Sequence, residues 1–171
     1  MPALATERAW CREALLRVSR TFALNIRCLS GRMLESVRLA YLLCRAADAL
    51  EDSWPGPASE IGARFDTLVA ALEGDGAAAT RLSIGATSLN GRSDVALLVR
   101  LPALLHLLTA LDGNDATDIR RCVRTMAMMP GFVNEVLISE RERILGGVSS
   151  LDMKKFNLRF GVQSSPAEAS G

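Results

Sequence analysis

The sequence is poor in aromatic residues and has almost no net charge. Its 171 residues include only five Phe, two Trp and one Tyr, and the formal net charge is +1. Near-neutrality argues against a polyanionic partner such as nucleic acid. The apolar content of 49% is mostly Leu and Ala, which favours helices over sheets. A chain of this length forms one domain with a sizeable core.

The sequence also lacks closely spaced cysteines and a long uninterrupted apolar segment. The four cysteines, at positions 11, 28, 44 and 122, do not have the spacing of a zinc site or a CxxC redox motif. We expect them to be reduced and buried. The longest apolar stretch, residues 95–111, is interrupted by Arg100 and Pro102, and is too short to span a bilayer. We therefore expect a cytoplasmic protein, with peripheral contact to a membrane surface left open.

Apolar residues recur at helical spacing through most of the chain, and no alternating strand pattern of useful length occurs. The sequence predicts helices over residues 6–18 and 32–52, a helix capped by Ser59, and one capped by Thr117 that runs to about Met129. Residues 77–92 are ambiguous between helix and loop, and 112–115 read as a turn. Residues 94–111 are predicted to be helical with a kink or break at Pro102. The predicted fold class is all-α.

Three acidic residues close the long helix predicted over residues 32–52. Asp48, Glu51 and Asp52 are related as i, i+3 and i+4, so they share a face at the negative end of the helix dipole. Such carboxylates repel each other unless a cation holds them together. Mg²⁺ with a diphosphate would satisfy this pattern, with Arg45 and Arg20 contacting phosphate oxygens. The alternative is a solvated helix end with an ordinary surface charge cluster.

Two segments carry a family resemblance. "VSRTFALNI" (18–26) followed by "LAYLLCRAADALEDS" (39–53) resembles the squalene/phytoene synthase family in order, gap and D-x-x-E-D pattern. The "DALED" form is more similar to squalene synthases than to phytoene synthases. A weaker match continues to "CVRTMAMM" (122–129). The resemblance implies the N-terminal part of an isoprenoid (terpenoid) synthase-type helical bundle.

The resemblance also implies roles for individual residues. Asp48, Glu51 and Asp52 would be Mg²⁺ ligands, with Asp48 and Asp52 taking part in catalysis. Arg20 and Arg45 would contact the substrate diphosphate, or the phosphate of NADPH in a squalene synthase. The residues that would shape the substrate pocket beside them are Ser19, Thr21, Phe22 and Tyr41. The residues alone leave open whether Phe22 and Tyr41 belong to the core, and whether Ser19 and Thr21 are helix caps.

The family reaction joins two prenyl diphosphates head to head, giving presqualene diphosphate and squalene from farnesyl chains, or phytoene from geranylgeranyl chains. Loss of diphosphate produces an allylic cation, which the double bond of the second chain attacks. The cation must be kept from water, and the leaving diphosphate must be held by preorganised charge. The sequence leaves open the chain length, the product and the use of NADPH.

The resemblance further implies a longer chain with a second acidic motif on a helix facing the first. No second D-x-x-x-D or D-x-x-E-D follows Asp52, and the nearest acidic segments are 112–118 and 140–142. We therefore expect family structure over residues 1–130, a divergent or frameshifted tail of weak order over 131–171, and negligible activity for this chain alone. The alternative function is a non-enzymatic helical interaction protein that self-associates through leucine faces at 34–43 and 97–108.

Overall fold

The computed structural model describes residues 2–89 and 92–128, and these residues form α-helices joined by short turns. The described residues contain no β-strand, so the predicted all-α class is confirmed. The predicted tail, residues 131–171, and the acidic segment 140–142 lie outside the described residues. The elements in chain order are α1 (Pro2–Val18), α2 (Arg20–Ile26), α3 (Gly31–Asp52), a 3₁₀ turn (Ala58–Glu60), α4 (Ile61–Leu72), α5 (Gly76–Thr87), α6 (Val95–Val99), α7 (Leu101–Thr109) and α8 (Gly113–Ala127).

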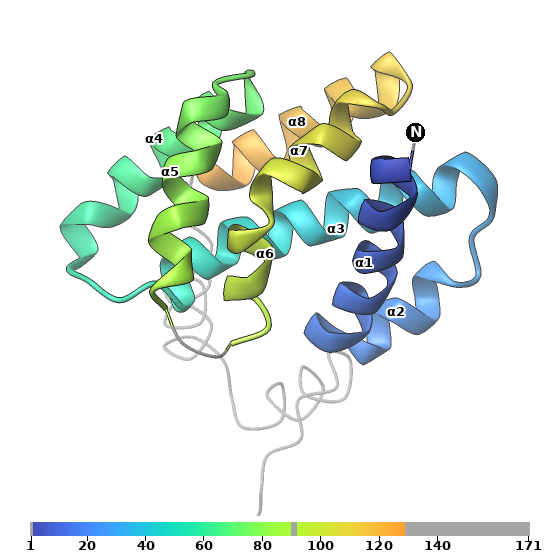
Figure 1. Ribbon diagram of the computed structural model, residues 1–171, viewed down its shortest axis with the longest axis horizontal. Helices are drawn as coiled ribbons and strands as arrows, with labels where there is room; N and C mark the ends of the chain where they lie inside the picture. Colours follow the sequence, from blue (N-terminus) through green and yellow to red (C-terminus); the bar gives the residue numbers. More distant parts are fainter. Residues whose placement is uncertain (1, 90–91, 129–171) are drawn as a thin grey trace, which may run out of the picture. The chain divides into compact units, whose positions relative to one another are not determined.

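The long helix α3 lies at the centre of the described bundle (Figure 1). It contacts α1, α2, α4, α6, α7 and α8. This position explains the apolar character of most of its circumference. The largest fully buried side chains of the bundle come from α3, α4, α6, α7 and α8, and they are Leu42, Leu43, Leu50, Leu68, Leu97, Leu98, Leu101, Leu104, Leu108 and Val123.

Burial of these leucines bears on the predicted self-association. Leu39, Leu42 and Leu43 of α3, like the leucines of α6 and α7, are packed inside the bundle. The two leucine faces that were expected to need a partner are therefore largely covered by helices of the same chain. Self-association stays a prediction, but exposed leucine faces no longer argue for it.

The apolar segment 94–111 breaks into two helices, as Pro102 predicts. Helix α6 ends at Val99, Arg100 separates the two pieces, and Pro102 occupies the second position of α7. A proline is tolerated there because the first backbone N–H groups of a helix have no partner within the helix. Every helix in the described part of the chain is too short or too polar to cross a lipid bilayer.

Two predicted helix caps are wrong. Ser59 lies inside the 3₁₀ turn, and α4 begins after Glu60 without a side-chain cap. Thr117 lies inside α8, whose N-cap is Asp112, with its carboxylate accepting a hydrogen bond from the amide of Asn114 at 3.1 Å. Residues 113–115 are consequently the first turn of α8 rather than part of a loop. The ambiguous residues 77–87 are helical in α5, which Asp75 caps.

The cysteines are free, but the prediction that all four are buried is wrong. Cys11 is buried and Cys44 is half-buried, whereas Cys28 and Cys122 are exposed. Cys28 follows α2 at the surface, and Cys122 is an exposed residue of α8. The apolar periodicity around these two positions was too weak to assign them to one side of a helix.

The turn after α3 is fixed by a glycine and a buried arginine. Gly56 has a φ of +136°, a backbone conformation that side-chain-bearing residues rarely adopt. The guanidinium of Arg64 lies against this turn, donating to the carbonyl of Pro55 at 3.1 Å and to Glu60 at 2.8 Å. A Cβ at position 56 would overlap this guanidinium. The turn therefore directs the chain away from the acidic end of α3 and into α4.

Candidate functional site

The two sequence segments expected to form the site meet where α2 packs beside α3. The rings of Phe22 on α2 and Tyr41 on α3 stack with centroids 4.6 Å apart. Phe22 remains 51% exposed, so it is not a core residue. Ser19 is the N-cap of α2, and its hydroxyl accepts a hydrogen bond from the Phe22 amide at 3.2 Å. Arg20 and Thr21 are exposed in the first turn of α2.

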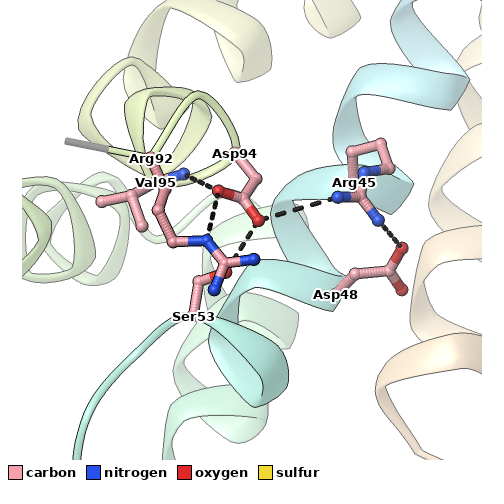
Figure 2. A network of polar contacts seen from close by, with 6 residues as sticks. All are labelled: Arg45, Asp48, Ser53, Arg92, Asp94 and Val95. Carbon is pink, nitrogen blue, oxygen red and sulfur yellow. Dashed lines mark hydrogen bonds and ion pairs between the residues drawn. The ribbon is translucent and has the colours of Figure 1, made fainter. Parts of the chain in front are cut away.

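Tyr41, Arg45, Asp48 and Asp52 follow one another at intervals of three and four residues along α3, which places them on one side of the helix. An Arg45 guanidinium nitrogen donates to Asp48 at 3.1 Å, and its other terminal nitrogen lies 3.6 Å from Asp94. Figure 2 shows the Arg45 side chain between these two carboxylates. Arg45 thus joins the predicted acidic cluster to a residue of another helix.

Asp94 was not among the predicted site residues, yet it is the most buried carboxylate near them. Its side chain is 7% exposed, and it caps α6 by accepting a hydrogen bond from the Val95 amide at 3.1 Å. The hydroxyl of Ser53, which directly follows α3, donates to Asp94 at 2.7 Å. Arg92 lies 3.7 Å from the same carboxylate (Figure 2). Asp94 therefore ties the end of α3 to the start of α6.

The contacts of Asp94 determine its charge state. Burial alone would raise the pKa of Asp94, but the hydrogen bonds from Ser53 and the backbone, together with the charge of Arg92, hold it below its usual value. Asp94 is consequently ionised at neutral pH. Its negative charge adds to those of Asp48, Glu51 and Asp52 around the end of α3. Among the described residues, Arg45 and Arg92 are the arginines that pair with these carboxylates.

The pKa of Asp48 is raised in this environment. Burial raises its pKa, the ion pair with Arg45 lowers it, and the charges of Asp52 and Asp94 raise it further, with a net upward shift. Glu51 is partly exposed and Asp52 is exposed. In the described residues, no three carboxylate, imidazole or thiol groups are arranged to hold a metal ion. An ion bound here would need further oxygen ligands beyond those that the described helices supply.

Replacing Asp48 with asparagine should raise the melting temperature at pH 7. Because the folded-state pKa of Asp48 is raised, its ionised form destabilises the folded protein above that pKa. Asparagine keeps a hydrogen-bond acceptor for Arg45 and removes the repulsion. The gain should disappear below the unfolded pKa of about 3.9, where Asp48 is protonated in both states. Calorimetry across this pH range measures the effect.

The matched control is Asp118→Asn, because Asp118 is exposed on α8 and pairs with Arg121 at 2.7 Å. This substitution removes an aspartate charge without relieving any crowding, so it should not raise the melting temperature. A stabilisation of equal size in both variants would contradict the crowding of Asp48.

The acidic side chains of the segment 112–118 make contacts that stabilise the fold. Asp112 caps α8, and Asp115 accepts a hydrogen bond from Ser36 of α3 at 2.6 Å. Arg32 lies 3.3 Å from Asp115 and 3.5 Å from Asp112. These contacts join the beginnings of α3 and α8, at the opposite end of α3 from Asp48. Residues 112–118 therefore do not face the acidic end of α3.

Comparison with known proteins supports the resemblance seen in the two motifs. Residues 15–133 match the family described as squalene/phytoene synthase, and this range contains Ser19, Arg45, Asp48 and Asp94. No curated protein and no solved structure matches the chain. The family match spans more than half of the sequence and coincides with the helices that carry the site. The chain therefore belongs to the squalene/phytoene synthase family.

Proposed function

We propose that this chain contributes the first metal–diphosphate half-site of a head-to-head prenyl synthase. Family membership supports a prenyltransferase function of the squalene/phytoene synthase type. The observation that carries the proposal is Asp48, a partly buried carboxylate held by Arg45 and crowded by further negative charge. Without a ligand, the repulsion between these carboxylates only destabilises the fold. A dication bound together with a phosphorylated ligand would remove that repulsion.

The donor set fits Mg²⁺ bound through a substrate. Mg²⁺ is usually held by one or two carboxylates together with substrate phosphates and water. Asp48 and Asp52 are the best placed carboxylates because they lie one turn apart on the same side of α3, and Glu51 is the third candidate. When bound, the metal would supply charge stabilisation for the departing diphosphate. A diphosphate would complete the coordination that these carboxylates begin.

The side chains around this position would orient the substrate. Arg45 is anchored on one side by Asp94, so its guanidinium is preorganised toward the acidic end of α3. Arg20 is exposed and free to contact a phosphate from α2. The stacked rings of Phe22 and Tyr41 offer an apolar surface for the first carbons of a prenyl chain. NADPH would be required only if the product is squalene.

The same residues do not complete an active site. The described helices hold one acidic motif, and the second acidic segment, 112–118, is bound to the other end of α3. Condensation needs charge on both sides of the diphosphate and a closed apolar cavity that excludes water. We therefore propose that this chain alone binds a prenyl diphosphate with Mg²⁺ and has negligible turnover.

A thermal-shift experiment tests the binding. Mg²⁺ together with a farnesyl thiodiphosphate analogue should raise the melting temperature by about 5 °C at an analogue concentration of about 100 times Kd. Mg²⁺ alone should have a smaller effect because the protein supplies few ligands. Asp48→Ala should abolish the shift, while Asp118→Ala, at an exposed position of α8 that pairs with Arg121, should retain it. No shift in the wild type, or an equal shift in Asp48→Ala, would overturn the proposal.

A further inference from the structure

A second chemically active pair lies beside the candidate site. Cys44 on α3 and Cys122 on α8 are free cysteines, and they lie close enough for Cys122 to raise the pKa of the Cys44 thiol. Cys44 is half-buried between the two helices, whereas Cys122 is exposed. Neither residue takes part in the prenyl chemistry proposed above, and their separation in sequence hides the pairing from a search for closely spaced cysteines.

The packing of α3 against α8 brings the two cysteines to the same level of the bundle. Ser36 on α3 donates to Asp115 on α8 at 2.6 Å, which sets the register of the two helices near their beginnings. Cys44 lies about 12 Å further along α3 and Cys122 about 10 Å further along α8, at a rise of about 1.5 Å per residue. Because α8 runs alongside α3 in the same direction (Figure 1), the two cysteines come level.

We propose that Cys44 and Cys122 form a reversible disulfide that joins α3 to α8 when the protein meets a small-molecule disulfide such as oxidised glutathione. The bond would connect elements that are separate in sequence and already packed together. It would lie one residue before Arg45, so oxidation would fix the helix that carries the candidate site. This inference does not depend on the proposed prenyl function.

The exchange proceeds in two balanced steps. The exposed Cys122, as thiolate, attacks one sulfur of oxidised glutathione, forming a mixed disulfide and releasing one glutathione thiolate. Cys44 then loses its proton and attacks the Cys122 sulfur, which releases the second glutathione. Two protein thiols are oxidised and one glutathione disulfide is reduced to two thiols.

The environments of the thiols set this order. Burial first, and then the neighbouring Cys122 and Asp48, together raise the pKa of Cys44 to about 12. Cys44 is therefore protonated at neutral pH and is not the group that attacks first. The remaining two cysteines have no thiol partner in the described residues. Cys11 is buried, and Cys28 donates to the carbonyl of Leu24 at 3.7 Å.

Trypsin separates all four cysteines, so the linkage can be read directly. Cleavage after arginine leaves Cys44 in "LAYLLCR" (39–45), Cys122 in "CVR" (122–124), Cys28 in "CLSGR" (28–32) and Cys11 in "AWCR" (9–12). The full chain is incubated with oxidised glutathione at mildly alkaline pH, and its remaining thiols are blocked before digestion and mass spectrometry. We expect a species in which "LAYLLCR" is linked to "CVR", lighter by two hydrogens than the two peptides together.

Variants assign each step. Cys44→Ser should abolish the link and leave Cys122 carrying a stable glutathione adduct, while Cys122→Ser should leave Cys44 free. Cys28→Ser, which removes an exposed thiol outside the pair, should leave the link unchanged. A reducing treatment should restore both thiols. The proposal would be overturned if Cys122 in the wild type accumulated only as the glutathione adduct, or if Cys28 replaced either member of the pair.

Discussion

Replacing Asp94 with alanine should lower the free energy of unfolding by about 3 kcal/mol at pH 7. The side chain is 7% exposed and accepts hydrogen bonds from Ser53 and from the Val95 amide. Its removal leaves the guanidinium of Arg45 partly buried with one carboxylate fewer and leaves the start of α6 without its cap. Urea denaturation followed by circular dichroism measures the loss.

The pH dependence separates the charge of Asp94 from its packing. Because the folded-state pKa is lowered, the charge stabilises the protein above the unfolded pKa of about 3.9. This stabilisation is lost as the pH falls through the folded-state pKa, so wild type and Asp94→Ala should converge at acid pH. Asp66→Ala is the control, since Asp66 is exposed on α4 and its loss should change stability by less than about 0.5 kcal/mol. Equal losses in the two variants would contradict the role of Asp94.

The helices that the sequence predicts best are those with strong periodicity and hard boundaries. The helix predicted over residues 32–52 is found at Gly31–Asp52, because apolar residues recur throughout it and Pro55, Gly56 and Pro57 prevent its continuation. The break near Pro102 follows from the same backbone rule. In both cases the controlling interaction is local, and a local interaction can be read from neighbouring residues.

Local sequence patterns do not predict helix α5. Its residues are mostly small, so they give no clear apolar stripe, yet Ala78, Ala79 and Ala86 are buried. Gly85 lies so close to the ring of Trp54 that a Cβ would come within 2.8 Å of the ring atoms. Close packing with a distant residue, rather than periodicity, selects the helix. The sequence between 77 and 92 contains no sign of that partner.

The wrong cap at Thr117 has a related cause. Asp112, Asn114, Asp115 and Thr117 all belong to residue types that cap helices, so propensity alone cannot choose among them. The contacts of Asp115 with Ser36 and Arg32 favour the earlier start. Thr117 then falls within the helix, where its hydroxyl donates to the carbonyl of Gly113 at 2.7 Å. Tertiary contacts decided between equivalent local signals.

The candidate site likewise has a part that the sequence predicts and a part that it does not. The Arg45–Asp48 pair lies within one turn of α3, and spacing was sufficient to predict that these side chains share a face. The sequence could not identify Asp94 as a site residue, because its partners Arg45 and Ser53 are distant in sequence. The available signal was an aspartate at the start of the predicted helix over 94–111. That signal indicates a cap and gives no information about a partner on α3.

Replacing Leu50 with alanine should lower the free energy of unfolding by about 3 kcal/mol, within the range of about 2–5 kcal/mol for buried leucines. Leu50 is fully buried in the last turns of α3, on the side opposite Asp48 and Asp52. The substitution leaves a cavity beneath the acidic end of the helix, where the packed neighbours cannot fully collapse. Chemical denaturation with an unchanged m-value would show that stability, and not the unfolded state, has changed.

Two further variants identify packing as the cause of the Leu50 effect. Leu50→Met nearly conserves the buried volume and should cost less than about 1.5 kcal/mol. Leu24→Ala removes the same atoms from a side chain that is 64% exposed on α2, so its effect should stay below about 0.5 kcal/mol. If all three substitutions cost the same, burial beneath the carboxylates would not explain the loss. If Leu50→Ala alone is costly, packing of the apolar face of α3 stabilises the end of the helix that carries Asp48 and Asp52.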